Sequence, residues 1–210
     1  MSPQRSNREQ LIEGTLRCLE RLPPERITAR VIAGESGANL ASIAYHFGSK
    51  DDLVTAAVIV GLDRWLDEVA SRLAELPAGP PAERYRRAAT VIEATRRRHL
   101  ALARNFVGAL ARAQHDERVR SLLATGFRRT RPAVASLLAL GDDAVGEDAG
   151  GLVLALFYGL LLQELLDPDL AITGDRLARA EARLRAVLPG DGIAPVRQPD
   201  RPDPRRSPCG

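Results

Sequence analysis

Residues 37–53, GANLASIAYHFGSKDDL, decide how this chain is expected to fold. The stretch places Tyr, His and Phe side by side at 45–47 in a chain with 4% aromatic residues, and it holds the single lysine, Lys50. Gly37 suits the left-handed residue that follows a helix end, and Asn39 is a common first cap of the next helix. The stretch therefore predicts a tight turn followed by a helix of about nine residues.

The segments around this stretch carry helix-start signals. Ser6, with a glutamate three residues later, has the spacing of a capping box, and the apolar stripe that follows is stopped at Pro23. Thr28 suits the N-cap of a second helix that runs to Gly37, and Ser49 suits the N-cap of a fourth. Two short helices joined by a tight glycine turn predict a helix-turn-helix.

The rest of the chain also has helical spacing. Apolar residues recur three and four positions apart from about residue 11 to about residue 188, and no run alternates with a period of two. We therefore predict an all-α fold of about nine helices. After the first three, the expected helices are 53–76, 85–112 with a break near His99, 117–140 with a kink or restart at Pro132, an apolar helix ending at 166, and 175–188. Residues 141–150, GDDAVGEDAG, form either a loop or the ragged start of the apolar helix.

The expected domain boundary lies inside the fourth helix, near residue 55. Residues 1–54 would form a three-helix, helix-turn-helix head, and residues 55–188 a larger helical body for ligand binding and dimerisation. Residues 189–210 contain six prolines and three glycines, which is typical of a disordered tail.

Charge alone does not predict the partner. The formal net charge is +3, and in the first sixty residues the basic and acidic groups are equal in number. The basic groups are Arg5, Arg8, Arg17, Arg21, Arg26, Arg30 and Lys50, and the acidic groups are Glu9, Glu13, Glu20, Glu25, Glu35, Asp51 and Asp52. A case for DNA binding must therefore depend on where the groups lie.

The sequence offers no chemistry for an enzyme. Its histidines, at 46, 99 and 115, are far apart, and Cys18 and Cys209 lie near opposite ends, so no metal or redox spacing is present. It contains neither a glycine-rich phosphate loop nor a serine elbow. We expect no enzymatic activity, no metal and no cofactor.

The apolar run at 151–166 is the strongest candidate for a membrane span. It is 16 residues long and includes Gln163 and Glu164, whereas a span needs about 20 mostly apolar residues. We therefore predict a buried helix and no membrane contact. Because the N-terminus also lacks the apolar core of a signal peptide, a cytoplasmic location is expected.

The short helix at 39–47 should have two different faces. Ile43 and Phe47 are four apart and can close the small core of the head. Asn39, Ser42 and Tyr45 are three apart and fall away from that pair. Their side chains can hydrogen-bond base edges or phosphate oxygens.

Flanking groups suit the phosphate backbone of DNA. Lys50 lies just past the short helix, where its ammonium can reach phosphate. Thr28 and Arg30 open the second helix, where the helix dipole also favours anions. Taken singly, Tyr45 and His46 are equally well explained as half-buried residues, and Lys50 as a solvated lysine. Their combination with the turn and the caps favours DNA.

Residues 27–54, ITARVIAGESGANLASIAYHFGSKDDLV, resemble the DNA-binding head of the tetracycline-repressor (TetR) family, and YHFGSKDDL is close to its best-known signature. The resemblance extends over about 45 residues, 8–54, whereas the remainder agrees only in length and helix content. It implies a homodimeric bacterial transcription regulator, usually a repressor. In such a regulator a small molecule bound by the helical body weakens the grip on an operator.

The resemblance also implies roles for single residues. Thr28 and Arg30 would contact phosphate, and further backbone contacts would come from Tyr45, His46 and Lys50. The residues implied to face the bases are Asn39, Leu40, Ala41, Ser42 and Ala44. Leu40, Ala41 and Ala44 stand where polar, glycine or aromatic residues are frequent in the family, so apolar contact with thymine methyl groups would join Ser42 in reading bases.

For the body, we expect a dimer interface formed by the helices at 150–166 and 175–188, two copies of which make a four-helix bundle. An effector pocket would lie among the middle helices, lined by Trp65, Phe106, Phe157 and Tyr158. Plain core packing is the competing interpretation of those aromatic residues.

Three alternatives stay open from the sequence. An effector-independent DNA-binding structural protein would have the same head. An activator would differ from a repressor only in the position of its operator. A helical enzyme has no motif to support it.

Overall fold

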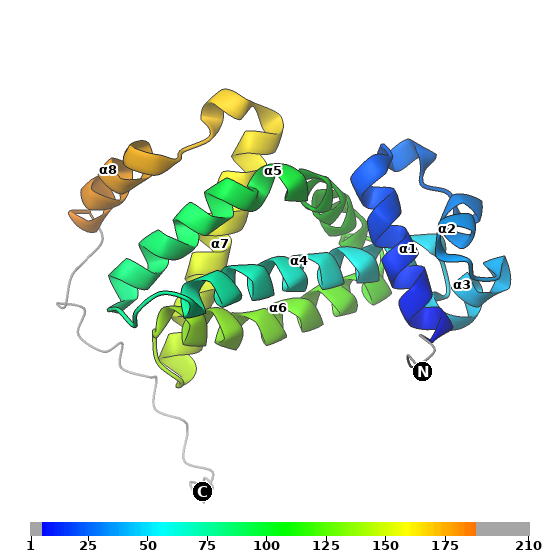
Figure 1. Cartoon of the computed structure of the whole chain (residues 1–210), viewed down its shortest axis with the longest axis horizontal. Coiled ribbons are helices and arrows are strands. Elements are labelled where there is room, and N and C mark those ends of the chain that lie inside the picture. Colours follow the sequence, from blue (N-terminus) through cyan, green and yellow to red (C-terminus); the bar gives the residue numbers. More distant parts are fainter. Residues whose placement is uncertain (1–5, 188–210) are drawn as a thin grey trace, which may run out of the picture. The chain divides into compact units, whose positions relative to one another are not determined.

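The computed structural model describes residues 6–187, which are entirely helical apart from turns and loops (Figure 1). The chain divides into two compact units, Met1–Ala171 and Ile172–Gly210. The described residues contain eight α-helices and two short 3-10 helices, η1 (Pro24–Arg26) and η2 (Pro168–Leu170), and no strand. The predicted all-α class is confirmed.

Three short helices form the N-terminal head: α1 (Asn7–Arg21), α2 (Ala29–Ser36) and α3 (Leu40–Phe47). The expected caps are present at the start of each helix. Ser6 forms the capping box, Thr28 caps α2 and Asn39 caps α3. Gly37 has φ +67°, in the left-handed region where glycine carries no steric penalty, and it makes the turn between α2 and α3.

Four long helices form the body: α4 (Lys50–Ala74), α5 (Pro81–Ala113), α6 (Glu117–Leu138) and α7 (Ala144–Leu166). Helix α4 begins in the head, capped by Ser49, and runs into the body between α5 and α6 (Figure 1). Helix α7 crosses α6 closely, since a Cβ built on Gly150 would lie 2.5 Å from the carbonyl oxygen of Arg131. One helix, α4, therefore belongs to both regions.

The buried side chains form two clusters. The first extends without a break from Leu11, Ile43 and Phe47 in the head to Phe106 and Val119 in the body. The second lies wholly in the body, around Trp65, Val134, Leu138, Leu154 and Leu161. Because head and body share a core, a displacement of α5 or α6 would also shift the side chains that pack beneath α3. A separate folding domain at 1–54 stays a prediction.

The middle helices differ from the sequence expectation. Helix α5 is continuous, so the break near His99 is wrong, and it begins at Pro81 rather than Tyr85 because proline is tolerated in the first turn, where its missing N–H has no partner. Helix α6 likewise continues through Pro132 without a restart. The described residues therefore contain eight α-helices where about nine were expected.

Helix α7 is longer and less buried than expected. It has 23 residues, because Asp143 caps it well before the apolar run begins. Among residues 6–187 it is the one helix long and apolar enough to cross a membrane. Its most apolar stretch of 18 residues has a mean hydropathy of 1.8, and 17% of that stretch is buried. The length argument against a span and the expectation of a buried helix were therefore wrong. One such helix is weak evidence for a span, because interface helices have the same composition.

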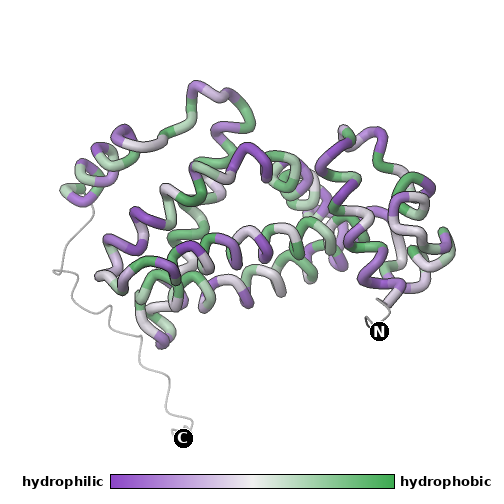
Figure 2. The backbone as a smooth tube through the Cα atoms, in the orientation of Figure 1, coloured by the Kyte–Doolittle hydropathy of each residue, from purple (hydrophilic) through white to green (hydrophobic). Residues whose placement is uncertain are grey.

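The second unit contributes α8 (Gly174–Arg185) to the described residues. Hydrophobic and hydrophilic residues alternate along it (Figure 2). Leu184 and Val187 are exposed. Leu188, which was expected to share this face, and the predicted disordered tail at 189–210 lie outside the described residues.

Candidate nucleic-acid interface

Helix α3 has one buried and one exposed face. Ile43 and Phe47 are buried in the core shared by head and body. On the opposite side Tyr45 is 85% exposed, Asn39 is exposed and Ser42 is partly exposed. Leu40, Ala41 and Ala44 are exposed as well. The spacing in the sequence therefore predicted the orientation of this helix, and the contact with DNA stays a prediction.

Two of the predicted contact residues also serve as helix caps. Thr28 Oγ1 accepts the N–H of Val31 at 3.2 Å, and Asn39 Oδ1 accepts the N–H of Ala41 at 3.0 Å. The Thr28 hydroxyl hydrogen and the two Nδ2 hydrogens of Asn39 are then the groups that can donate to an outside acceptor. Thr28 and Asn39 are therefore better suited to donate to phosphate oxygens than to accept a hydrogen bond from a donor group of a base.

Lys50 forms a weak local ion pair. Its Nζ lies 2.8 Å from Oδ1 of Asp51, and both side chains are more than one third exposed. Exposed pairs of this kind contribute about 0–1 kcal/mol, so a phosphate can replace the carboxylate at little cost. Arg30 and Thr28 are exposed at the start of α2. The phosphate-contact roles predicted for all three remain compatible with their positions.

An additional cation lies beside α3. The guanidinium of Arg8, in the first turn of α1, is 5.3 Å from the ring centroid of Phe47, and the His46 ring packs edge-on between Tyr45 and Phe47 at 4.8 and 6.4 Å. Sequence reasoning missed Arg8, because nothing in the local pattern at residue 8 indicates contact with residue 47. A cation–π contact leaves the guanidinium N–H groups free for anions.

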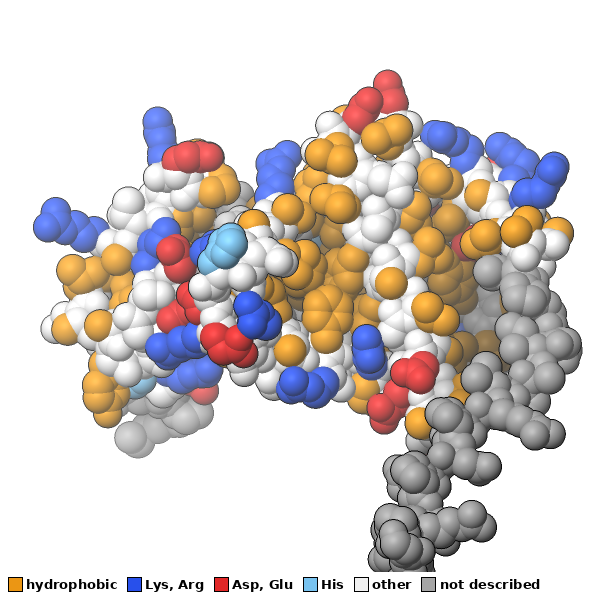
Figure 3. Space-filling model, turned by 180° about the vertical axis from the view of Figure 1, so that it is seen from behind, with side chains coloured by type: hydrophobic (Ala, Val, Ile, Leu, Met, Phe, Trp, Pro, Cys, Tyr) orange, Lys and Arg blue, Asp and Glu red, His pale blue; other side chains and the backbone are white. Residues whose placement is uncertain are grey.

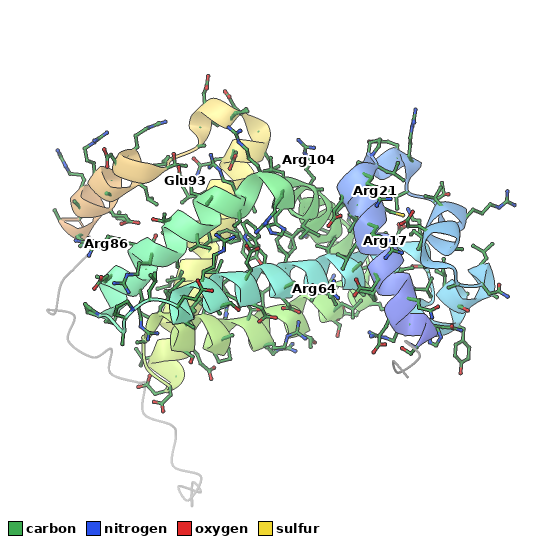
Figure 4. The ribbon with its side chains drawn as sticks, in the orientation of Figure 1. Arg17, Arg21, Arg64, Arg86, Glu93 and Arg104 are labelled. Atoms are coloured by element: carbon green, nitrogen blue, oxygen red, sulfur yellow. The ribbon has the colours of Figure 1, made fainter. Side chains whose placement is uncertain are left out.

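Ion pairs hold the head in shape. Arg17 Nε lies 2.6 Å from Oε1 of Glu35, and Arg21 Nη1 is 3.7 Å from the same oxygen. The hydrogen bond from Arg17 lowers the pKa of Glu35. Figure 4 shows both arginines on α1 and Arg64 further along α4, where Arg64 Nη1 donates to Glu13 Oε2 at 3.1 Å. Helix α1 is thus fixed both to α2 and to α4.

The four residues predicted to line an effector pocket do come together. Trp65 lies 5.2 Å from Phe157, Phe106 stacks on Tyr158 at 4.7 Å, and Phe157 contacts Tyr158 at 5.2 Å, all between ring centroids. Two rings that the sequence did not single out join this aromatic cluster, namely Phe127 and His99. The rings touch one another, as in a packed core, so their role as a binding site is not tested by the packing.

Polar groups border the aromatic cluster. Trp65 Nε1 donates to Thr95 Oγ1 at 2.7 Å, and burial raises the pKa of Tyr158 to about 12, so its hydroxyl keeps its proton. Arg96 pairs with Glu164 at 3.1 Å, which ties α5 to the C-terminal part of α7. Figure 3 shows hydrophobic side chains gathered in a hollow on the face of the body where α7 lies.

Metal ligands are not grouped in the part of the chain that the structure describes, since no three His, Cys, Asp or Glu side chains there are placed to hold an ion. Cys18 is buried, and burial raises the pKa of its thiol.

Comparisons with known proteins bear on the fold. No protein-family model and no curated protein sequence matches this chain. Among solved structures, a protein of Rhodococcus sp. RHA1 described as a candidate transcriptional regulator gives a TM-score of 0.64 at 17% identity, covering 85% of this chain and 94% of that one. A TetR transcription regulator from Haloarcula marismortui gives 0.56 at 18% identity, covering 86% and 95%.

The multidrug binding protein EbrR is similar to the same extent. Its complex with imidazole gives a TM-score of 0.61 at 22% identity, covering 90% of this chain and 99% of that one, and it has also been solved with ethidium. The fold of this chain is therefore that of TetR-type transcriptional regulators, as residues 27–54 indicated.

Proposed function

We propose that this chain is a TetR-family transcriptional regulator that binds double-stranded DNA. One observation supports the proposal above all others: α3 presents Asn39, Ser42 and Tyr45 outward while Ile43 and Phe47 anchor it. A short helix displayed in this way after a tight turn suits insertion into the major groove.

Roles follow from the chemistry of each side chain. Ser42, in the middle of α3, reads base edges, assisted by apolar contacts of Leu40, Ala41 and Ala44 with thymine methyl groups. The neighbouring Tyr45 and His46 bind the DNA backbone. Thr28, Arg30 and Lys50 add phosphate contacts from the starts of α2 and α4.

Two copies of the chain would form the working unit, a homodimer. On α7 a stripe of exposed apolar residues runs along one side: Val145 and Leu152, each 74% exposed, Leu156, and Leu166, 76% exposed. Surface of this kind suits burial against a second copy, together with the apolar side of α8. Twofold symmetry would then match a palindromic operator, with recognition helices about 34 Å apart.

We infer that the body binds a small-molecule effector and that the protein is a repressor released by it. The aromatic cluster around Trp65 and Tyr158 supports a flat, mostly apolar effector. The effector would bind best to a body conformation in which the spacing of the two recognition helices no longer matches successive major grooves. Binding of the effector would then lower the affinity for DNA without changing any residue that contacts a base. Such a regulator works in the cytoplasm and needs no catalysis.

The test is a gel-shift titration against the DNA that flanks the coding region of this protein, repeated with a panel of flat apolar compounds. We expect binding of one or a few fragments at low protein concentration, and release by at least one compound. Because Trp65 is the single tryptophan, the same compound should change its fluorescence. Equal, weak binding to all fragments with no release would favour the effector-independent structural protein instead.

A further inference from the structure

The first turn of α6 reaches the turn that joins α3 to α4. Arg118 lies over Gly48, since a Cβ built there would be 3.1 Å from its Cζ atom and 3.3 Å from Nη2. Nε of the same side chain lies 3.4 Å from Oδ2 of Asp52. One arginine of the body thus spans residues 48–52, the turn after α3 together with the first three residues of α4, and we call this segment the α3–α4 turn.

The chemistry at both ends of this contact favours a fixed arrangement. Gly48 has φ +84°, which a residue with a side chain rarely adopts, and the absent side chain leaves the space that the guanidinium fills. Asp52 is only 6% exposed, and a carboxylate so deeply buried requires a partner. Arg118 supplies the charge for Asp52 and the contact surface for Gly48.

The α3–α4 turn and the residues just before it provide three of the DNA-backbone contacts of the proposed function. Lys50 lies within it, and Tyr45 and His46 directly precede it. Resting on that function, we propose that Arg118 is a positioning residue for DNA binding. It holds the α3–α4 turn in the conformation in which Lys50 meets the DNA backbone, and it acts through the turn without touching DNA.

Helix α6 also connects this residue with the aromatic cluster. Val119 and Leu123, just after Arg118, are buried in the core shared by head and body. Phe127 follows nine positions after Arg118 (127 − 118 = 9), about 13 Å along the helix, and its ring lies 5.5 Å from that of Tyr158. A ligand that displaces Phe127 would therefore move Arg118, and with it the turn.

The chain offers a matched control. Arg129 also lies on α6, also pairs with an aspartate of α4 (Asp63), and has a side chain 61% exposed against 59% for Arg118. The probe is a short duplex of mixed sequence, because backbone contacts need no operator. Arg118→Ala should weaken its binding about three- to tenfold, whereas Arg129→Ala should leave it unchanged. Arg118→Ala should also melt at a lower temperature than Arg129→Ala, because it leaves the buried Asp52 unpaired, so binding is compared at a temperature at which both variants are folded.

A second variant separates positioning from direct contact. Asp52→Asn removes a negative charge near the DNA. If Arg118 bound phosphate itself, Asp52→Asn would strengthen DNA binding. If Arg118 is a positioning residue, Asp52→Asn loosens the α3–α4 turn and weakens DNA binding, as Arg118→Ala does. Arg118→Lys, which keeps the charge for Asp52, should restore binding to within about threefold of the unsubstituted protein.

Combination with Lys50→Ala completes the test. If Arg118 is a positioning residue, Arg118→Ala should weaken DNA binding little further in a protein that already carries Lys50→Ala, because Arg118 acts through Lys50. Additive losses, stronger binding by Asp52→Asn, or equal losses for Arg118→Ala and Arg129→Ala would each overturn the inference alone. If the unsubstituted protein bound no duplex, the proposed function would fail and this inference with it.

Discussion

Lys50 is the residue whose role is most directly measurable. Replacing it by alanine removes one phosphate contact, so affinity for all DNA sequences should fall alike. The slope of log K against log salt concentration should shrink by about one. Arg86→Ala is the control, because Arg86 is exposed on α5 and, among residues 6–187, its guanidinium donates to the carbonyl oxygen of Ala82 in its own helix. An unchanged slope for Lys50→Ala would refute the phosphate contact.

His99 links stability to pH. Burial lowers the pKa of this imidazole, although Glu68 opposes the effect, and its ring stacks on Trp65 at 4.7 Å. The unfolded chain therefore takes up the proton first as pH falls. Stability should be lost as pH drops through the ordinary histidine pKa of about 6.5, and the loss should end below the lowered folded pKa.

Thermal unfolding between mildly alkaline and mildly acidic pH tests this expectation. His99→Gln should flatten the pH dependence, while His115→Gln, at an exposed position, should keep it. Trp65 fluorescence should follow the same titration, since a protonated ring then stacks on the indole. A steep dependence that survives His99→Gln would show that another group is responsible.

At the scale of single elements, the end of α6 carries a correctable strain. Ala139 has φ +55°, the one positive φ of a non-glycine residue among those described, and its neighbour Leu140 donates back to the carbonyl of Ala135 at 2.9 Å. Ala139→Gly should raise the free energy of unfolding by about 0.5–1 kcal/mol in chemical denaturation.

A glycine inside the same helix is the control. Ala133 is exposed in α6, and Ala133→Gly should lower the free energy of unfolding by about 1 kcal/mol. If both substitutions lowered it equally, the end of α6 would not be strained.

Helix ends were predictable where a cap is local. Ser6, Thr28, Asn39 and Ser49 each accept an N–H two or three residues later, so a few neighbouring letters determine each start. The break expected near His99 failed because tertiary packing along α5 outweighs local preference. The N-terminal extension of α7 stayed open between a loop and a helix start, because the segment after its cap Asp143 is polar.

The exposed face of α7 makes a further prediction at this scale. Leu152→Glu would place an unpaired charge in the proposed dimer interface and should weaken dimerisation at least about 100-fold. Leu76→Glu, an exposed leucine at the end of α4, should have no effect. Sedimentation over a range of concentrations distinguishes the two. A Leu152→Glu protein with the mass of the unsubstituted one would exclude this face from the interface.

In the whole molecule, the structure of the head was more predictable from the sequence than that of the body. The orientation of α3 follows from the four-residue spacing of Ile43 and Phe47. The contact of Arg118 with Gly48 joins residues seventy positions apart (118 − 48 = 70), and no local pattern indicates it. Likewise, the core shared by head and body depends on how α5 and α6 cross α4, which the sequence does not reveal.

In the proposed function α3, doubled by a twofold axis, reads DNA. Selection of bound duplexes from a randomised library tests it most directly. We expect enrichment of a palindrome with half-sites about one helical turn, or a multiple of it, apart, and a changed sequence preference for Ser42→Ala. A library that shows no enrichment, or a selected site without twofold symmetry whose sequence Ser42→Ala does not alter, would contradict it.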